Sequence, residues 1–136
     1  MQKLYIIRGL PGSGKTTYAE KLCAELQAKK QKAIVVEADQ FFTDKDGKYF
    51  FVPSLLGEAH KKCFHKAIEY MDKGFTVLVS NTFTRRWEYK HYMDEARKRF
   101  IPVEVVEMKE NFGSIHDVPQ TTLDNMKARW EPHKEF

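Results

Sequence analysis

Short apolar runs alternate along this chain with longer stretches in which apolar residues recur at helical spacing. The apolar runs predict strands at residues 3–8, 33–36, 75–80 and 103–108. The longer stretches predict helices at residues 15–29, 54–72, 85–99 and from residue 119 onward. A strand that crosses over through a helix pairs in parallel with a later strand. This order therefore predicts a three-layer α/β fold, in which a short parallel sheet of about four strands lies between helices.

Length and composition narrow the class of protein. With 136 residues, the chain is expected to form one domain over residues 1–136. No apolar run approaches the roughly 20 residues of a membrane span, and no signal-peptide core opens the chain. We therefore expect a soluble, cytoplasmic protein without membrane contact. The formal net charge of +4 is compatible with a phosphate-rich partner.

A glycine-rich segment at residues 9–16 matches the pattern GxxxxGK[ST] at every specified position. It lies between the first predicted strand and the first predicted helix, where this pattern binds phosphate. Glycines let backbone N–H groups turn toward a phosphate, and the start of a helix adds partial positive charge. A plain glycine-rich turn is the alternative interpretation. The residues expected to contact a nucleotide are Gly9, Pro11, Gly12, Ser13, Gly14, Lys15, Thr16 and Thr17.

The same segment predicts the nucleotide and the metal. Lys15 is expected to reach the β- and γ-phosphates, and the Thr16 hydroxyl is expected to bind Mg²⁺. The chain has no NKxD element of the kind with which GTPases read guanine, so ATP is the favoured nucleotide. The third predicted strand ends in Ser80 rather than in the carboxylate typical of ATPase motors, which favours a small kinase.

Two carboxylates follow the second predicted strand at the edge of the sheet where ligands bind in such folds. Asp39 is our candidate for the general base that receives the proton of an acceptor hydroxyl, and Glu37 is the competing candidate. If the strand stays extended, we expect at most one of the two to face the phosphates. Asp39 has two alternative roles: it caps the next turn, or it holds Mg²⁺ through water alongside Thr16.

The segment Ser80–Thr84 is the second loop expected at this edge. Asn81 and Thr82 carry small polar groups that can orient an acceptor hydroxyl, and capping of the following helix by Asn81 or Thr84 is the alternative role. Arg85 follows and can bind an acceptor phosphate through paired hydrogen bonds, although an exposed arginine is the plainer interpretation.

A candidate phosphate lid lies at residues 109–118. Phosphoryl transfer needs cations around the moving group, and this segment contains Lys109 and His116 but no arginine. His116 is a candidate substrate ligand, and a solvated loop histidine is the alternative interpretation.

The helix predicted at residues 54–72 carries a row of basic side chains, namely His60, Lys61, Lys62, His65 and Lys66. A solvated helix face is the plain interpretation, and a ridge that binds nucleic acid is the sharper one. Trp87 and Trp130 are expected to serve packing rather than stacking on bases.

Five segments together resemble a known family. They are residues 9–17, 37–42, 46–63, 80–89 and 116–131. In order and spacing they are similar to the small P-loop kinases related to the 5′-hydroxyl kinase domain of bacteriophage polynucleotide kinase, including AAA-type ATP-binding domains. The resemblance implies an adenylate-kinase-like fold with a lid before the last helix. It also implies that Lys15 and Thr16 handle ATP and Mg²⁺, that Asp39 is the general base, and that the loop at Asn81 and Thr82 lines the acceptor side.

The chain departs from the family pattern at several positions near the acceptor. Where the family often has acidic, amide or arginine side chains, this chain has Gln40, Phe42, Ser80, Phe83 and Gly113. Gly113 stands at the position of the lid arginine. The replacements that the sequence offers are Lys109, or Arg129 folding back.

Three hypotheses about function follow. The leading one is an ATP- and Mg²⁺-dependent phosphotransferase that acts on a hydroxyl, with the 5′-hydroxyl of a nucleic acid or nucleotide as the favoured acceptor. The second is a kinase for a sugar, nucleoside or antibiotic. The third is a non-catalytic ATP-binding module that gates an interaction with nucleic acid or protein.

Overall fold

The computed structural model describes residues 2–43, 46–48, 52–109 and 119–134. The strands are β1 (Leu4–Gly9), β2 (Ala33–Val36), β3 (Thr76–Asn81) and β4 (Val103–Met108). The α-helices are α1 (Lys15–Ala28), α2 (Leu56–Asp72), α3 (Trp87–Lys98) and α4 (Gln120–Arg129). Two 3-10 turns, η1 (Ala38–Phe42) and η2 (Pro53–Leu55), lie between β2 and α2. Within these ranges, no helix is long and apolar enough to cross a membrane.

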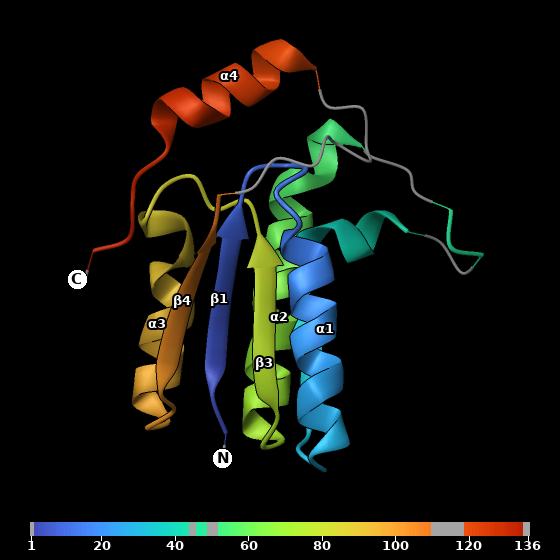
Figure 1. Cartoon of the computed structure of the whole chain (residues 1–136), viewed down its shortest axis with the longest axis vertical. Coiled ribbons are helices and arrows are strands. Elements are labelled where there is room, and N and C mark those ends of the chain that lie inside the picture. Colours follow the sequence, from blue (N-terminus) through green and yellow to red (C-terminus); the bar gives the residue numbers. More distant parts are fainter. Residues whose placement is uncertain (1, 44–45, 49–51, 110–118, 135–136) are drawn as a thin grey trace.

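The four strands are parallel and lie in the order β2-β3-β1-β4, which confirms the predicted α/β fold. Figure 1 shows β3, β1 and β4 side by side. β1 lies between β3 and β4. Arg8 is therefore in register with Asn81 on one side and with Glu107 on the other, and Gly9 pairs with Met108. The glycine-rich segment consequently leaves the middle of the sheet at its carboxyl edge, next to the loop that follows β3.

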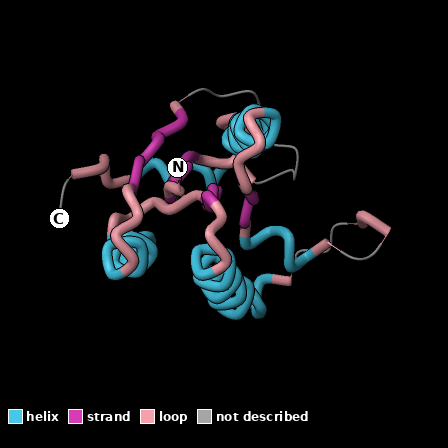
Figure 2. The backbone as a smooth tube through the Cα atoms, turned by 90° about the horizontal axis from the view of Figure 1, so that it is seen from below, coloured by secondary structure: helices cyan, strands magenta, loops and turns pink. Residues whose placement is uncertain are grey.

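Helices cover both faces of the sheet, as Figure 2 shows. Leu4 and Ile6 belong to the core between the sheet and the helices α2 and α3. Ile7 belongs to the core on the opposite face, together with Ala19 and Cys23 of α1. Because β1 and β3 are covered on both faces, each contains an unbroken apolar run, Leu4 to Ile7 in β1 and Val77 to Val79 in β3, rather than an alternating pattern.

Two helices begin two residues later than the sequence predicts. Before α2, Pro53 opens the 3-10 turn η2, and the α-helix begins at Leu56. Before α3, the Glu88 carboxylate accepts hydrogen bonds from the Arg85 N–H (2.7 Å) and the Thr84 hydroxyl (2.9 Å). This reach back from the first turn of α3 satisfies donors just ahead of the helix, as a capping box does.

α4 lies beyond the carboxyl edge of the sheet, and the chain after it runs back on the side of α3 (Figure 1). The Glu131 N–H donates to the Thr84 carbonyl (2.7 Å), and the Arg86 N–H donates to Glu131 Oε1 (2.9 Å). The His133 N–H donates to the Glu107 carboxylate. These bonds tie the C-terminal segment both to β4 and to the loop after β3.

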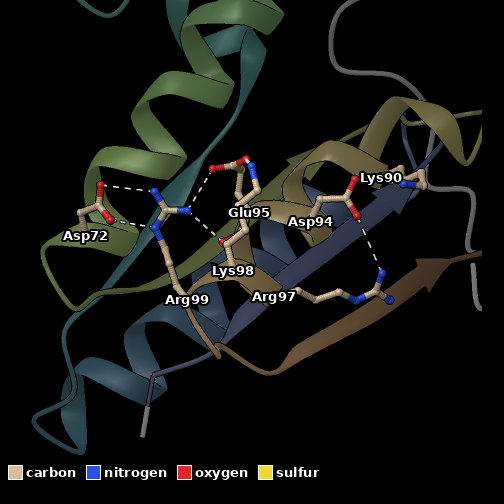
Figure 3. A network of polar contacts seen from close by, with 7 residues as sticks. All are labelled: Asp72, Lys90, Asp94, Glu95, Arg97, Lys98 and Arg99. Carbon is tan, nitrogen blue, oxygen red and sulfur yellow. Dashed lines mark hydrogen bonds and ion pairs between the residues drawn. The ribbon is translucent and has the colours of Figure 1, made fainter.

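At the opposite end of the sheet, charged side chains join α2 to α3 (Figure 3). Arg99 donates from Nε to Asp72 Oδ1 (2.7 Å) and from Nη1 to Glu95 Oε1 (3.0 Å). Lys98 adds a second cation 2.8 Å from Glu95. We name Asp72, Asp94, Glu95, Arg97, Lys98 and Arg99 the amino-end cluster; Lys90, also drawn in Figure 3, lies one turn earlier in α3, toward the carboxyl edge.

Candidate nucleotide and acceptor site

Three glycines shape the turn between β1 and α1. Gly12 and Gly14 both have a φ of 83°, in the left-handed region that other residues rarely adopt, and Gly14 directly precedes α1. A Cβ atom on Gly9 would lie 2.9 Å from Met108 Cβ and closer still to the Ser13 hydroxyl, so no side chain fits there. The turn therefore requires glycine at each of these positions.

The inside of this turn offers donors to an anion. The Ser13 hydroxyl is buried and has no hydrogen-bond partner among the described residues. The first turn of α1 contains no acidic residue and no side-chain cap, so its backbone N–H groups remain available. Together with the partial positive charge of a helix start, these groups fit a phosphate.

Lys15 is the first residue of α1 and is partly buried. Burial lowers the pKa of Lys15 below its ordinary value, while the nearby carboxylates of Asp39 and Glu37 act in the opposite direction. One cation thus faces two carboxylates in a site that excludes part of the solvent.

Glu37 contacts the glycine-rich segment directly. The Thr16 hydroxyl donates to Glu37 Oε2 at 2.7 Å. Burial raises the pKa of Glu37, and the Thr16 hydrogen bond and the Lys15 charge oppose that rise. Because the Thr16 hydroxyl is the donor in its hydrogen bond to Glu37, the lone pairs of its oxygen remain available to a cation. Hydroxyl and carboxylate oxygens are ligands that Mg²⁺ accepts, so this pair fits the metal.

Asp39 lies in the first turn of η1 and is exposed. The expectation that at most one of Glu37 and Asp39 faces the phosphate site is wrong, because both carboxylates act on Lys15. β2 ends at Val36, and the chain then turns in a 3-10 helix instead of staying extended. Residues two apart in an extended strand also share one face, so the expectation fails for either geometry.

The loop after β3 is held by its own side chains. Asn81 is buried; its Oδ1 accepts from the Ala38 N–H (2.9 Å), and its Nδ2 donates to Cys63 Sγ (3.5 Å). Asn81 thereby fixes the start of η1, which carries Asp39, relative to α2. Thr82 is partly buried beside it. Asn81 is linked to the segment of the candidate base by its hydrogen bond to the backbone of Ala38, the residue before Asp39.

Arg8, for which the sequence predicted no role, also holds the loop after β3 in place. Arg8 is fully buried in β1, and its guanidinium donates to the Phe83 carbonyl from Nε (3.0 Å) and Nη2 (2.6 Å). Nη1 lies 3.2 Å from Glu107 Oε1, and the Trp130 ring lies 4.1 Å from the guanidinium carbon. A single arginine at the end of an apolar strand is the feature of the sequence that indicates a buried, hydrogen-bonded guanidinium.

Two further arginines lie at this edge. Arg129 donates from Nε to the Thr84 hydroxyl (3.1 Å), so it folds back from α4 to the loop after β3. Arg85 is exposed, and its guanidinium forms a long ion pair with Glu131 at 3.9 Å. Lys109 is exposed at the end of β4. His116 and Gly113, with the predicted lid, lie outside the described residues.

Two aromatic residues differ from their predicted environments. His60 is partly buried in the first turns of α2 rather than fully solvated. Burial lowers the pKa of His60 below its ordinary value, and the carboxylates of Glu88 and Asp39 oppose that fall. The packing role expected of Trp87 is wrong, because 71% of that residue is exposed at the start of α3. Trp130, by contrast, packs on Arg8 as expected.

The sequence profile of the AAA domain family matches residues 4–111 of this chain. Among curated proteins, NEDD4-binding protein 2 of Homo sapiens is 33% identical over 96 residues. That match covers 70% of this chain and 5% of the human protein, so this chain spans a small part of the relative's length.

Solved structures share the fold. APS kinase CysC of Mycobacterium tuberculosis, in complex with AMPPNP and APS, aligns with a TM-score of 0.63 at 22% identity, over 94% of this chain and 68% of that chain. A chain of the Pnkp1/Rnl/Hen1 RNA repair complex aligns with a TM-score of 0.60 at 19% identity, over 99% of this chain and 40% of that chain. At these identities the likeness concerns the fold, which is that of P-loop kinases.

Proposed function

The chain belongs to the AAA domain family, with the fold of its P-loop kinase-like members, and from this premise we propose that it transfers the γ-phosphate of ATP to a hydroxyl. The favoured acceptor is the 5′-hydroxyl of a nucleic acid or nucleotide. One observation carries the proposal: Lys15, the Thr16–Glu37 pair and Asp39 converge at the carboxyl edge of the sheet. A glycine-rich turn with a purely structural role does not require two carboxylates beside its lysine, whereas binding of Mg²⁺ and proton transfer both require carboxylates.

The donor side uses residues of the turn and of α1. Backbone N–H groups of Gly12 and of Gly14 to Thr16, with the Lys15 ammonium, would hold the β- and γ-phosphates. Thr16 and Glu37 would hold Mg²⁺, directly or through water. Mg²⁺, when bound, supplies positive charge that offsets the charge of the β- and γ-phosphates. Glu37 is thereby assigned to the metal side, because its carboxylate already binds Thr16.

The acceptor side uses Asp39. The oxygen of the acceptor hydroxyl forms a bond to the γ-phosphorus, and the bond from that phosphorus to the bridging oxygen breaks, which releases ADP. The proton of the hydroxyl passes to the Asp39 carboxylate. Asp39 suits this role because it is exposed to an incoming acceptor and lies close to Lys15. Arg129, which donates to the Thr84 hydroxyl in the loop after β3, is our candidate for a cation beside the transferred group.

Two likenesses bear on the acceptor. The RNA repair complex that contains Pnkp1 aligns over 99% of this chain, which supports a polynucleotide end. The APS kinase aligned here was solved with the small molecule APS, which supports a small hydroxyl compound as the alternative. The excess of positive charge on the chain favours the polynucleotide.

The test is transfer from γ-labelled ATP in the presence of Mg²⁺. Acceptors are 5′-hydroxyl DNA and RNA oligonucleotides, nucleosides and APS, with a reaction lacking acceptor as the blank and Lys15→Ala as the control variant. Label on the oligonucleotides that is lost in Lys15→Ala supports the proposal. Label on nucleosides or APS alone favours the small-molecule kinase. ATP binding without transfer to any acceptor contradicts the proposal and leaves a nucleotide-binding module.

A further inference from the structure

A groove of about 770 Å³ lies between η1 and the outer face of α2, beside the candidate acceptor site. Its lining includes Phe41, Lys61, Lys62, His65 and Lys66, and we name it the α2 groove. We propose that the α2 groove binds single-stranded nucleic acid on the 3′ side of the acceptor nucleotide. This inference rests on the proposed function and adds to it the path of the substrate strand.

The charge of the groove is the first argument. Each of its two glutamates has a lysine of its own: Glu58 lies 3.5 Å from Lys62, and Glu69 lies 3.3 Å from Lys73. Lys61 and Lys66 have no carboxylate partner among the described residues. The groove therefore keeps positive charge that is not compensated by the protein, which suits a phosphate backbone.

The placement of Lys66 is the second argument. Gln40 Nε2 donates to the Val35 carbonyl (3.1 Å), and Lys66 Nζ lies 3.5 Å from Gln40 Oε1. The amide contacts the ammonium without neutralising it, so Lys66 keeps its full charge. Gln40 follows Asp39 directly, so the Lys66 charge lies beside the segment that carries the candidate base.

The exposed ring of Phe41 is the third argument. Phe41 is 38% exposed, whereas its neighbour Phe42 is buried in the core. An exposed aromatic side chain beside a row of cations is the combination with which proteins bind single strands, because bases stack on the ring while phosphates meet the lysines. A duplex would hide its base faces from Phe41, which is why the proposal specifies a single strand.

Continuity with the active edge is the last argument. Phe41 lies two residues after Asp39, and the groove extends from there to Glu69. At 1.5 Å per residue, the helical lining from residue 57 to residue 69 covers roughly 18 Å. A strand whose 5′-hydroxyl reaches Asp39 can therefore continue along the groove for more than one nucleotide.

The experiment compares acceptors of two lengths, a 5′-hydroxyl 12-mer of single-stranded DNA and a nucleoside 3′-monophosphate. The test variants are Lys61→Gln/Lys66→Gln and Phe41→Ala. The matched control is Lys21→Gln/Lys29→Gln, which removes two exposed charges from α1 on the other face of the sheet. Anisotropy of a labelled 12-mer gives binding without any transfer reaction, and γ-labelled ATP gives kcat and KM.

Lys61→Gln/Lys66→Gln should weaken binding of the 12-mer by about 10- to 30-fold at 0.1 M salt. The slope of log K against log salt concentration should become shallower by about 1.4, since each lost phosphate contact of a single strand removes about 0.7. Phe41→Ala should weaken binding about fivefold or more. KM should rise for the 12-mer and stay unchanged for the nucleoside 3′-monophosphate, with kcat unchanged for both. The α1 control should change none of these quantities by more than about twofold.

Failure of the groove and failure of the kinase are separate results. If the 12-mer receives phosphate and the groove variants bind and react like the α1 control, the α2 groove proposal is overturned while the proposed function stands. If no acceptor receives phosphate but the groove variants still lose 12-mer binding and salt slope, the groove proposal is supported and the kinase proposal falls.

Discussion

Two clusters of charged side chains lie at opposite ends of the sheet, and they are assembled differently. In the amino-end cluster every acid has a basic partner, and the partners lie on the surface of α2 and α3 (Figure 3). At the carboxyl end, the partly buried Lys15 faces the two carboxylates Glu37 and Asp39. The first arrangement is complete within the protein and ties two helices together. The second includes the buried Ser13 hydroxyl, which has no hydrogen-bond partner among the described residues, and the arrangement is suited to a charged ligand.

The largest difference between the two ends should appear in catalysis. Asp39→Asn removes the candidate base without changing its size, and kcat should fall by about 10²- to 10⁴-fold while ATP binding stays near wild type. Asp94→Asn makes the same change in the amino-end cluster and should leave kcat unchanged. Steady-state kinetics together with ATP titration measure both effects. A wild-type kcat for Asp39→Asn would show that the proton goes elsewhere, with Glu37 as the next residue to test.

A second comparison concerns two arginines of unequal burial. Arg8→Met removes the buried cation paired with Glu107 and both side-chain hydrogen bonds to the Phe83 carbonyl, and we expect the free energy of unfolding to fall by about 3 kcal/mol. Arg99→Met breaks contacts at the surface and should leave the urea midpoint almost unchanged. Urea unfolding of both variants measures the two losses of stability. Equal losses would mean that burial does not distinguish the two arginines.

A third comparison concerns two glycines. Gly9→Ala places a Cβ against Ser13 and Met108, so we expect a loss of stability of about 1–3 kcal/mol together with weaker ATP binding. Gly57→Ala lies in α2 with nothing within 4 Å of the new Cβ, and should raise stability by up to about 1 kcal/mol. Thermal unfolding and ATP titration test the pair. Tight ATP binding by Gly9→Ala would show that the turn has more room than its geometry indicates.

The smallest expected effect concerns pH at the amino-end cluster. The Arg99 guanidinium lowers the pKa of Asp72 below its ordinary value. Because the folded pKa is depressed, the contribution of this pair to stability is present above the unfolded pKa of about 3.9 and is lost as pH falls through the folded value. NMR titration of the Asp72 carboxyl should show that low pKa, and Arg99→Met should return it toward the ordinary value. An unchanged pKa in the variant would assign the shift to another group.

Much of the fold could be predicted because local patterns and tertiary packing agree. The strands at residues 33–36 and 103–108 have the predicted bounds, since a short apolar run between polar segments has few other ways to be buried. The turn before α1 was equally readable, because its glycines meet a local backbone requirement. Helix starts were less readable. At α3 the start depends on Glu88 reaching back to Arg85, a contact that periodicity does not encode.

In the candidate site, too, some residues could be predicted from local sequence and others depend on tertiary packing. Lys15 and Thr16 follow from the motif alone, and the sequence also placed Asp39 at the correct edge of the sheet. The ranking of Asp39 and Glu37 depended on where β2 ends and on the bond from Thr16, which joins residues 21 positions apart. Trp87 was misjudged because an aromatic residue in a helical pattern is usually buried, and the orientation of α3 decides otherwise.

By itself, the sequence determined the elements of this protein and its phosphate-binding turn, because both depend on neighbours within a few positions along the chain. Tertiary structure decided the strand order β2-β3-β1-β4, the burial of Arg8 beneath the loop after β3, and the meeting of Glu37 with Thr16. These features depend on which distant segments pack together. Packing of that kind follows from the burial of whole faces and from the pairing of buried charges, which no single stretch of sequence contains.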